Sequence, residues 1–376
     1  MIENKFIVFA VDHFNPLGVI RSLGEIRINP IVVLYSKHPM LVQYSKYISK
    51  LYVVDTIDKG LEIITKNYSG ESQKPFILAT SDDVESVLDQ HYNELKDNFY
   101  FYNAGEQGRI TQMMDKKTIC EMGKECGLLV PKTEEVEKGQ MPQTLRYPLI
   151  TKATISTIEN WKANVFICNN EDELKEAYKY IVGDHVLLQE YVKKVDELNI
   201  EGFSINDGND VYMPLQNRFY RVTEDSYGNY LHIDKFLQID LLEKIKEIFK
   251  KTRYNGVFEM EFMIDKDNNY YFLEINFRNS AWLYSYTKCG VNLPVMFAKS
   301  VIAGHIVNED ENVKKLPFKV IDEITDFKWS VLSGKVNIFK WLIELFTSDC
   351  TFYFNKHDMK PFYMYLYNRL VHAIKK

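Results

Sequence analysis

The sequence is poor in cysteine and lacks several patterns that define common protein classes. Its five cysteines form no CxxC pair and lie near no paired histidines. This argues against a disulfide framework or a zinc site and favours a reducing compartment, for which we expect the cytoplasm. No run of 18 apolar residues is present, so we expect no membrane-spanning segment. Met1 runs almost directly into FIVFAV and a polar loop, which is unlike a secretory leader.

The sequence also lacks an excess of basic residues. Its net charge is −6 and its pI is near 5.8, whereas nucleic-acid binding depends on clustered Lys and Arg. We therefore expect no nucleic-acid partner. What is present is 46% apolar and 26% charged residues over a length of 376. This composition predicts a folded protein of two or three domains.

The first third of the chain alternates short apolar runs with helical patterns. This alternation predicts a parallel sheet with helices on both faces. No GxGxxG motif follows the first run, which argues against a dinucleotide site. Sheets of this kind bind ligands beyond the carboxyl ends of their strands. The predicted strands are residues 5–11, 30–35, 50–55 and 76–81, the predicted helices include 16–24 and 82–95, and the strand-end loops are 12–15, 36–39 and 80–83.

A change of pattern follows the helix predicted between the cap Asp115 and Gly127. Strands and isolated helices now succeed one another, as in an α+β arrangement, and the last seventy residues are expected to be helical and rich in aromatics. We predict four parts: an N-terminal α/β domain (1–110), a small lobe (111–188), a large lobe (189–305) and a C-terminal helical extension (306–376).

A β-hairpin is predicted from GVFEMEFMI (256–264), the turn DKDNN and YYFLEINF (270–277). A turn symmetric about the bond between Asp267 and Asn268 places Glu261 opposite Glu274. Side chains alternate across a strand, so one face should be polar and the other apolar. The predicted polar face is Glu259, Glu261, Glu274, Asn276 and Arg278, and the predicted apolar face is Phe258, Met260, Phe262, Leu273, Ile275 and Phe277.

Two directly opposed carboxylates predict a cation between them. At about 5 Å they repel by roughly 3 kcal/mol at an effective dielectric constant of about 20. Mg2+ suits the position because it takes oxygen ligands and completes its shell with water and phosphate groups. Asn276 adds a neutral oxygen on the same face. The hairpin alone leaves open that the face is an ordinary solvated one.

Several motifs follow one another in a recognisable order. They are Lys152 in YPLITK, QEYV at 189–192, Glu261, and Glu274-x-Asn276-x-Arg278. In this order and spacing the chain resembles the ATP-grasp superfamily, above all its carboxylate-amine ligases, to which D-aspartate ligases belong. The resemblance implies an α/β plus α+β fold with an N-terminal parallel-sheet domain, a small α+β lid domain and a larger catalytic α+β domain.

The resemblance also implies roles for residues that would bind ATP. Lys116 and Lys152 would bind its phosphates, and Glu190 with the backbone of Val192 would bracket the adenine. Glu197 would accept hydrogen bonds from the ribose hydroxyls, because a carboxylate is an acceptor only. Asp196 is the competing choice for that task.

A second group of residues would act on the phosphates and the reacting atoms. Arg278 would stabilise charge on the transferring phosphoryl group or on the oxyanion that follows. Arg218 and Arg221 are further candidates for binding phosphate or carboxylate, for which the guanidinium fork is suited. The metal ligands implied are Glu261, Glu274 and Asn276, holding one or two Mg2+ ions, with Mn2+ as the alternative ion.

The loop ATISTIENWKAN (153–164) departs from the family pattern. Many ATP-grasp proteins cover the phosphates with a glycine-rich loop after the second lysine, and this loop has no glycine. Lys162, together with Thr154, Ser156 and Thr157, could instead supply ammonium and hydroxyl contacts.

The implied reaction activates a small-molecule carboxylate as an acyl phosphate and joins it to an amine. An amino acid, a peptide or a cell-envelope precursor is compatible with this reaction. Two alternatives remain open: a non-catalytic ATP-binding protein with the same fold, and carbamoyl-phosphate or thiol chemistry. A homodimer is also left open.

The C-terminal segment has an apolar stripe at Phe362, Leu366, Leu370 and Ile374. Lys360, Arg369, Lys375 and Lys376 flank it. Such helices usually pack on a core, and docking on a membrane surface is the less favoured alternative.

Overall fold

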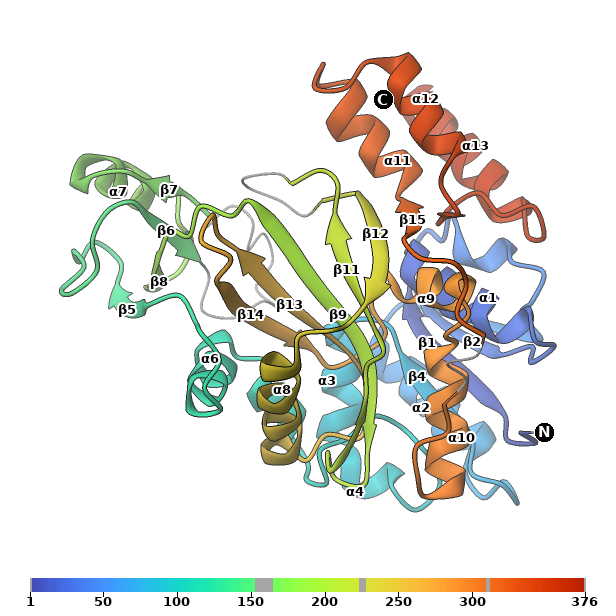
Figure 1. Cartoon of the computed structure of the whole chain (residues 1–376). Coiled ribbons are helices and arrows are strands. Elements are labelled where there is room, and N and C mark those ends of the chain that lie inside the picture. Colours follow the sequence, from blue (N-terminus) through green and yellow to red (C-terminus); the bar gives the residue numbers. More distant parts are fainter. Residues whose placement is uncertain (1, 153–164, 223–227, 309–311, 375–376) are drawn as a thin grey trace.

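The N-terminal domain is a four-stranded parallel sheet, as the sequence predicts. The computed structural model describes residues 2–152, 165–222, 228–308 and 312–374. The strand order is β3-β2-β1-β4, and Figure 1 shows this blue domain on the right. The strands are β1 (Phe6–Val11), β2 (Ile31–Tyr35), β3 (Lys50–Val54) and β4 (Phe76–Ala79), joined by α1 (Phe14–Gly24), the 3-10 turn η1 (Val42–Tyr44) and α2 (Ile57–Tyr68).

The helices that follow β4 lead toward the next lobe. The predicted helix over 82–95 is in fact two, α3 (Asp82–Gln90) and α4 (Tyr92–Leu95), because His91 leaves the helical conformation. After α5 (Arg109–Met113), helix α6 (Lys116–Glu125) begins at the predicted cap, where the Asp115 carboxylate accepts the Thr118 N–H at 2.8 Å. It ends before Gly127, whose φ of 80° suits glycine.

The small lobe has its own sheet and its own core. Its strands are ordered β5 (Thr133–Glu137), β8 (His185–Glu190), β6 (Leu149–Lys152) and β7 (Ile167–Cys168), and α7 (Glu171–Tyr178) packs on them. Val136, Leu149, Leu174 and Val186 belong to a buried cluster separate from the main core. Figure 1 shows this lobe projecting from the rest of the molecule on the left.

The large lobe is an eight-stranded sheet of order β14-β13-β9-β11-β12-β15-β16, with β10 paired to β9. The apolar segment VYMPLQ (211–216) is divided at Met213 and Pro214 between β10 and β11, because proline has no N–H for a sheet ladder. The elements are β9 (Asp196–Ile205), β10 (Asp210–Tyr212), β11 (Leu215–Phe219), β12 (Tyr230–Lys235), β13 (Gly256–Ile264), β14 (Tyr270–Asn276), α8 (Ile239–Thr252), α9 (Leu283–Cys289) and α10 (Leu293–Ala303).

The hairpin β13–β14 has the predicted pairing at its polar end. Glu261 pairs with Glu274 and Glu259 with Asn276. Near the turn the pairing is offset by one residue, since Phe262 pairs with Phe272, and a bulge between the two registers absorbs the difference. The predicted symmetric turn is therefore wrong.

The bulge also changes which residue of β14 belongs to the apolar face, so one member of the predicted face is wrong. Phe272 is fully buried in the main core. Leu273, which we expected there, lies at the extra position and lines a cavity instead. The remaining predicted members of this face, from Phe258 to Phe277, are buried.

The C-terminal segment is only partly helical, which corrects the expectation of an all-helical tail. β15 (Phe318–Ile321) pairs with β12, and β16 (Cys350–Thr351) pairs with β15, so two short strands extend the large sheet. Between and after them lie α11 (Glu323–Asp326), the π-helical turn 327–331, α12 (Ile338–Phe346) and α13 (Lys360–Ile374). None of the helices that the structure describes is long and apolar enough to cross a membrane.

A buried arginine ties this segment to the N-terminal domain. Arg21 of α1 is fully buried. Its guanidinium donates to the Asp358 carboxylate at 3.1 Å and to the carbonyl oxygens of Phe352 and Tyr353 at 2.6 and 3.1 Å. The end of the chain is therefore part of the core around its first helix.

Candidate functional site

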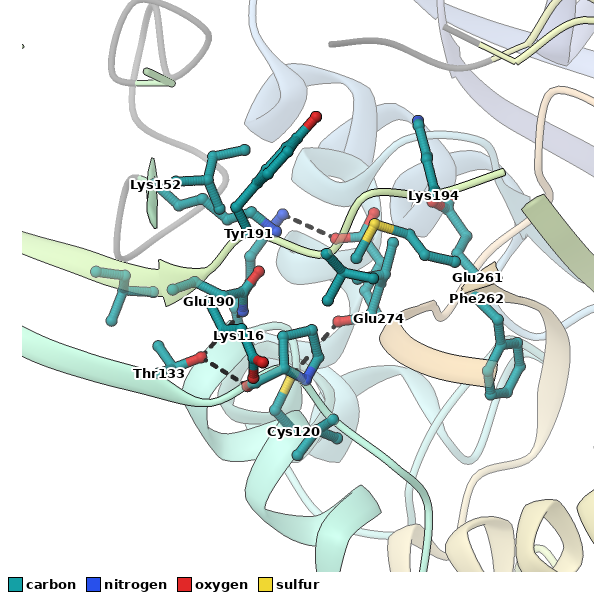
Figure 2. Close-up of a pocket in the computed structure, with 18 of the residues that line it drawn as sticks. Lys116, Cys120, Thr133, Lys152, Glu190, Tyr191, Lys194, Glu261, Phe262 and Glu274 are labelled. Atoms are coloured by element: carbon teal, nitrogen blue, oxygen red, sulfur yellow. Dashed lines mark hydrogen bonds and ion pairs between the residues drawn. The ribbon is translucent and has the colours of Figure 1, made fainter. Parts of the chain in front are cut away.

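A cavity of about 1040 Å³ lies between the small lobe and the large sheet. Its walls come from α6, β6, β8, β9, β13 and β14, with Trp329 and Lys335 from the C-terminal segment. Figure 2 shows Lys152 and Glu190 on the small-lobe side, facing Glu261 and Glu274 of the hairpin. This volume is large enough for a nucleotide-sized ligand.

The floor of the cavity belongs to a polar face that spans three neighbouring strands. On β9, Glu197, Asn199 and Glu201 alternate with buried apolar residues. In the β9–β13 ladder Asn199 pairs with Glu261 and Glu201 with Glu259, and the hairpin ladder adds Glu274 and Asn276 on β14. Paired residues share a face of the sheet, so one side of the large sheet concentrates carboxylates and amides.

Hydrogen bonds hold this face together. The Asn276 amide donates to the Glu259 and Glu261 carboxylates at 3.0 and 2.9 Å, and the Asn199 amide donates to Glu259 at 2.9 Å. The Glu259, Glu261 and Asn276 trio predicted from the alternation is thus in direct contact.

The two opposed carboxylates differ in how easily they ionise. Burial, and then the charges of Glu274 and Glu259, raise the pKa of Glu261 well above its ordinary value. Desolvation of the partly buried Glu274 opposes its ionised form, but the Lys116 ammonium at 2.9 Å holds the pKa of Glu274 below the ordinary value. Like charges that share a site separate in pKa in this way. The negative charge of Glu261 is therefore offset less by nearby positive charge than that of Glu274.

Two lysines from different elements line the cavity with these carboxylates. Lys116 lies in the first turn of α6, and the Glu274 charge raises its pKa. Lys152 lies at the end of β6, where burial and the charge of Lys116 lower its pKa to about 8. Both line the cavity, so the sequence correctly brings together Lys116, Lys152, Glu261 and Glu274.

Arg278 connects the polar face with the N-terminal domain. Its Nε donates to the Asp82 carboxylate at 2.6 Å, and its Nη2 donates to the Asn276 side-chain oxygen at 2.9 Å. Burial opposes the charged form, but Asp82 outweighs it and raises the pKa of Arg278 further. Asp82 follows β4, in one of the strand-end loops that the sequence analysis singled out.

The cavity is also lined by the residues predicted to contact adenine and ribose. Glu190 and Val192 line it, together with Tyr191. Glu197 also lines it, forms an ion pair with Lys194 at 2.7 Å, and has a pKa raised by burial. Asp196 is instead paired with Arg218. The arrangement therefore favours Glu197 over Asp196 as a ligand-binding carboxylate.

Two predicted arginines are not brought to this cavity. Arg218 donates to Asp196 from β11, at 2.7 Å from its Nε. Arg221 pairs with Asp326 and Glu344 of the C-terminal segment, the latter at 2.6 Å. Neither lines the cavity, and their binding of substrate anions stays a prediction. Lys162 lies outside the described residues, as do Thr154, Ser156 and Thr157.

The residues present fit a magnesium ion held jointly with phosphate groups. Among the described residues, no three His, Cys, Asp or Glu side chains are grouped to hold a metal by themselves. Glu261, Glu274 and Asn276 form the smaller set of two carboxylates and an amide that Mg2+ accepts alongside water and phosphates. The incompletely compensated charge of Glu261 gives such an ion an electrostatic reason to bind there.

The contribution of β9 to the polar face is not predicted from the sequence. Glu201 is fully buried and accepts a hydrogen bond from the Ser280 hydroxyl. Its position opposite Glu259 follows from the β9–β13 pairing. The period-two spacing of Glu197, Asn199 and Glu201 was the available signal, but the pairing of strands so distant in sequence could not be read from it.

Comparisons by sequence find several relatives. The chain is 23% identical to the D-aspartate ligase of Enterococcus faecium (strain Aus0004) over 323 residues, which cover 78% of this chain and 76% of that enzyme. It is 26% identical to an N5-carboxyaminoimidazole ribonucleotide synthase of Staphylococcus aureus (strain COL) over 171 residues. The second match spans 45% of this chain and 44% of that enzyme. No known family model matches the chain.

Comparisons of the fold decide the architecture. An ADP complex of an N5-carboxyaminoimidazole ribonucleotide synthetase matches with a TM-score of 0.66 and 13% identity, over 89% of this chain and 85% of that one. The L-amino acid ligase of Bacillus licheniformis matches with a TM-score of 0.62 and 12% identity, over 80% and 75%. All these relatives are ATP-grasp enzymes. The chain has the ATP-grasp fold.

The ATP-grasp fold explains the division of the site between two lobes. In this ATP-grasp chain the small lobe supplies Lys152 and Glu190, and the large sheet supplies Glu261 and Glu274. The predicted α/β plus α+β architecture is thereby confirmed. At such low identities the likeness to solved structures shows the fold, and the chemistry must be judged from the site.

Proposed function

We propose that this ATP-grasp protein is an ATP-dependent ligase that joins a small-molecule carboxylate to an amine. The main support is the polar face of β9, β13 and β14, which places Glu261 and Glu274 at a nucleotide-sized cavity, with Asn276 hydrogen-bonded to Glu261. Lys116 and Lys152 supply positive charge at the same cavity. Phosphoryl transfer needs this combination, because its catalysis is mainly positioning and charge stabilisation.

Each side chain has a task in this proposal. Lys116 and Lys152 bind the ATP phosphates, Glu190 and the Val192 backbone bind the adenine, and Glu197 accepts the ribose hydroxyls. Glu261, Glu274 and Asn276 would hold one or two Mg2+ ions, which neutralise phosphate charge when bound. Arg278 stabilises negative charge on the transferring group. Its bond to Asn276 and its ion pair with Asp82 fix the guanidinium for that purpose.

The reaction has two steps. A carboxylate oxygen of the acid attacks the terminal phosphorus of ATP, the phosphorus–oxygen bond to ADP breaks, and an acyl phosphate forms. The amine then attacks the acyl carbon, and the bond from that carbon to the bridging oxygen breaks. Phosphate leaves with the bridging oxygen, and the amine loses a proton as the amide forms. Water must be excluded between the steps, which the space between the lobes and the N-terminal loops around Asp82 can provide.

The test is release of ADP over mixtures of acids and amines with Mg2+, followed by mass spectrometry of any amide. Bicarbonate belongs among the acids, because N5-carboxyaminoimidazole ribonucleotide synthetases are among the relatives. Glu261→Gln should lower turnover by about 100-fold or more, since it removes the charge that binds the cation. Glu243→Gln is the matched control, because it makes the same chemical change at an exposed position on α8.

Folding can be separated from chemistry in the same variants. The neutral amide relieves the repulsion that raises the pKa of Glu261, so Glu261→Gln should unfold at the same temperature as the parent protein or higher. Full turnover in Glu261→Gln would show that the site is wrong. ATP binding with no amide formed from any acid and amine pair would favour the non-catalytic alternative.

A further inference from the structure

Exposed apolar side chains are concentrated in the C-terminal segment. More than half of the large apolar side chains that the described residues expose lie between residues 327 and 371. Phe346 is 81% exposed, Phe339 73% and Ile343 65%. Single exposed apolar residues are ordinary, but contiguous groups of them mark interaction surfaces.

Helix α12 has a buried inner face and an exposed apolar outer face. Its inner face is anchored by Trp341, which is buried and whose indole N–H donates to the Asp326 carboxylate at 2.9 Å. Phe339, Ile343 and Phe346 follow a spacing of four and three residues and point away from that anchor. The helix thus presents an outward stripe of three large apolar side chains.

Helix α13 repeats the arrangement. Phe362 and Tyr365 pack against the main core, and the Asn368 amide donates to the Met40 carbonyl oxygen at 3.2 Å. The stripe predicted from the sequence is therefore partly wrong, because Phe362 faces inward. The exposed stripe is Tyr363, Leu366, Tyr367 and Leu370. Figure 1 shows α12 and α13 at the same corner of the molecule. We name the outward stripes of the two helices the C-terminal apolar face.

The charge of this segment is opposite to that of the whole chain. Residues 327–376 contain eight Lys and Arg and three Asp and Glu, although the chain carries a net charge of −6. Two of the three acidic groups are turned inward: Glu344 pairs with Arg221, and Asp358 is buried against Arg21. The third, Asp349, accepts the backbone N–H of Lys319 at 2.8 Å. Around the C-terminal apolar face, Lys340, Lys360 and Arg369 are exposed.

We propose that the C-terminal apolar face docks on the surface of a bilayer that contains anionic lipids. Aromatic and aliphatic side chains enter the headgroup region, while the lysines beside them bind lipid phosphates. A second copy of the chain fits less well, because lysine is depleted in protein–protein interfaces and here lysine flanks both helices. The proposed attachment is interfacial, because no helix in the described part of the chain is long and apolar enough to cross a bilayer.

Docking has a consequence for the nucleotide cavity. Trp329 and Lys335 lie in the stretch that leads into α12, and both line the cavity. The bound surface and the cavity therefore share one short segment of chain. This inference does not depend on the ligase reaction, since it rests on side chains that line no part of the polar face.

The experiment is co-sedimentation of the full chain with vesicles. Phosphatidylcholine vesicles are compared with vesicles that also contain phosphatidylglycerol, at low and high salt. The protein should sediment with the anionic vesicles and be released by salt. The triple substitution Phe339→Ser, Ile343→Ser and Phe346→Ser should weaken partitioning by about tenfold or more. Leu237→Ser with Ile239→Ser is the matched control, because both residues are 73% exposed outside this segment.

The outcomes are distinct. Sedimentation of the parent and of the control, with loss in the triple variant, supports lipid docking. Lys340→Glu should also weaken binding to anionic vesicles, since it replaces a positive charge beside the outward stripe with a negative one. A parent protein that stays in the supernatant at low salt overturns the proposal. A dimer in analytical ultracentrifugation that the triple variant abolishes, with no vesicle binding, assigns the face to a second copy instead.

Discussion

Glu201 and Glu259 pair across β9 and β13, and both carboxyl groups are removed from water. Burial raises the pKa of each to about 8, and for Glu259 the nearby Glu201 adds to the effect. The ordinary value is 4.5. At pH values between these two pKa values, both carboxyl groups stay protonated in the folded protein but are ionised in the unfolded chain. Stability from these groups is therefore fully present below pH about 4.5 and falls until pH about 8.

A single substitution can isolate this effect. Glu201→Gln cannot ionise, so its unfolding free energy should exceed that of the parent by an amount that grows as the pH rises. The difference should increase by at most about 1.4 kcal/mol per pH unit within the window and then level off. Chemical denaturation at a series of pH values measures it. A difference that is constant across the window would mean that Glu201 is ionised throughout.

At the residue scale, the sequence predicts more of the hairpin than of its neighbours. Alternation places Glu261 and Glu274 on one face, the assumed symmetric turn places them opposite each other, and the ladder has that pairing. The symmetric turn from which we derived it is wrong by one residue, and the bulge at Leu273 restores the register. The partners of Arg218 and Arg221 depend on contacts between distant segments. No local pattern encodes such contacts.

Helix α6 carries Lys116 in its first turn, so the start of this element positions a site residue. The Asp115 carboxylate caps it and also accepts the Thr118 hydroxyl at 2.7 Å. Asp115→Ala should cost about 1 kcal/mol of stability. It should also weaken binding of Mg-ATP several-fold, because the turn that holds Lys116 frays.

A second cap provides the control. Thr56 caps α2 by accepting the Lys59 N–H at 3.3 Å, in the N-terminal domain. Thr56→Ala should lower stability comparably and leave nucleotide binding unchanged. Thermal unfolding and titration calorimetry on both variants decide the matter. Equal nucleotide affinities in the two variants would contradict a role for the start of α6.

At the element scale, the sequence predicts strands and helix caps well. It predicts poorly where a helix or strand is interrupted. Asp115 and Gly127 mark helix ends where expected. The small strands β15 and β16 were missed because each is short and pairs with a distant part of the chain. Their existence is a property of the sheet they join rather than of their own residues.

At the scale of the whole molecule, the described residues form three buried cores, and two of them border the cavity between the lobes. The small lobe is packed separately from the core shared by the N-terminal domain and the large sheet. A nucleotide bound between them should link their motions. With Mg-ADP at 100 times its dissociation constant, binding contributes about 2.7 kcal/mol to stability.

Hydrogen exchange can locate this stabilisation. Peptides that cover β6, β8 and β14 should exchange more slowly with Mg-ADP present. Peptides around a second cavity, of about 730 Å³ and lined by Ser36, Lys37 and Lys59, should be unchanged and serve as the control. Slower exchange at this second cavity alone would place the nucleotide in the N-terminal domain.

The buried Arg21 has a consequence for how the protein is made. Its guanidinium leaves the ribosome early, as part of the first helix, while its partners Phe352, Tyr353 and Asp358 are among the last residues translated. An unpaired cation in that core would cost about 3–5 kcal/mol. The first domain to be synthesised therefore reaches its final packing only after nearly the whole chain has been translated.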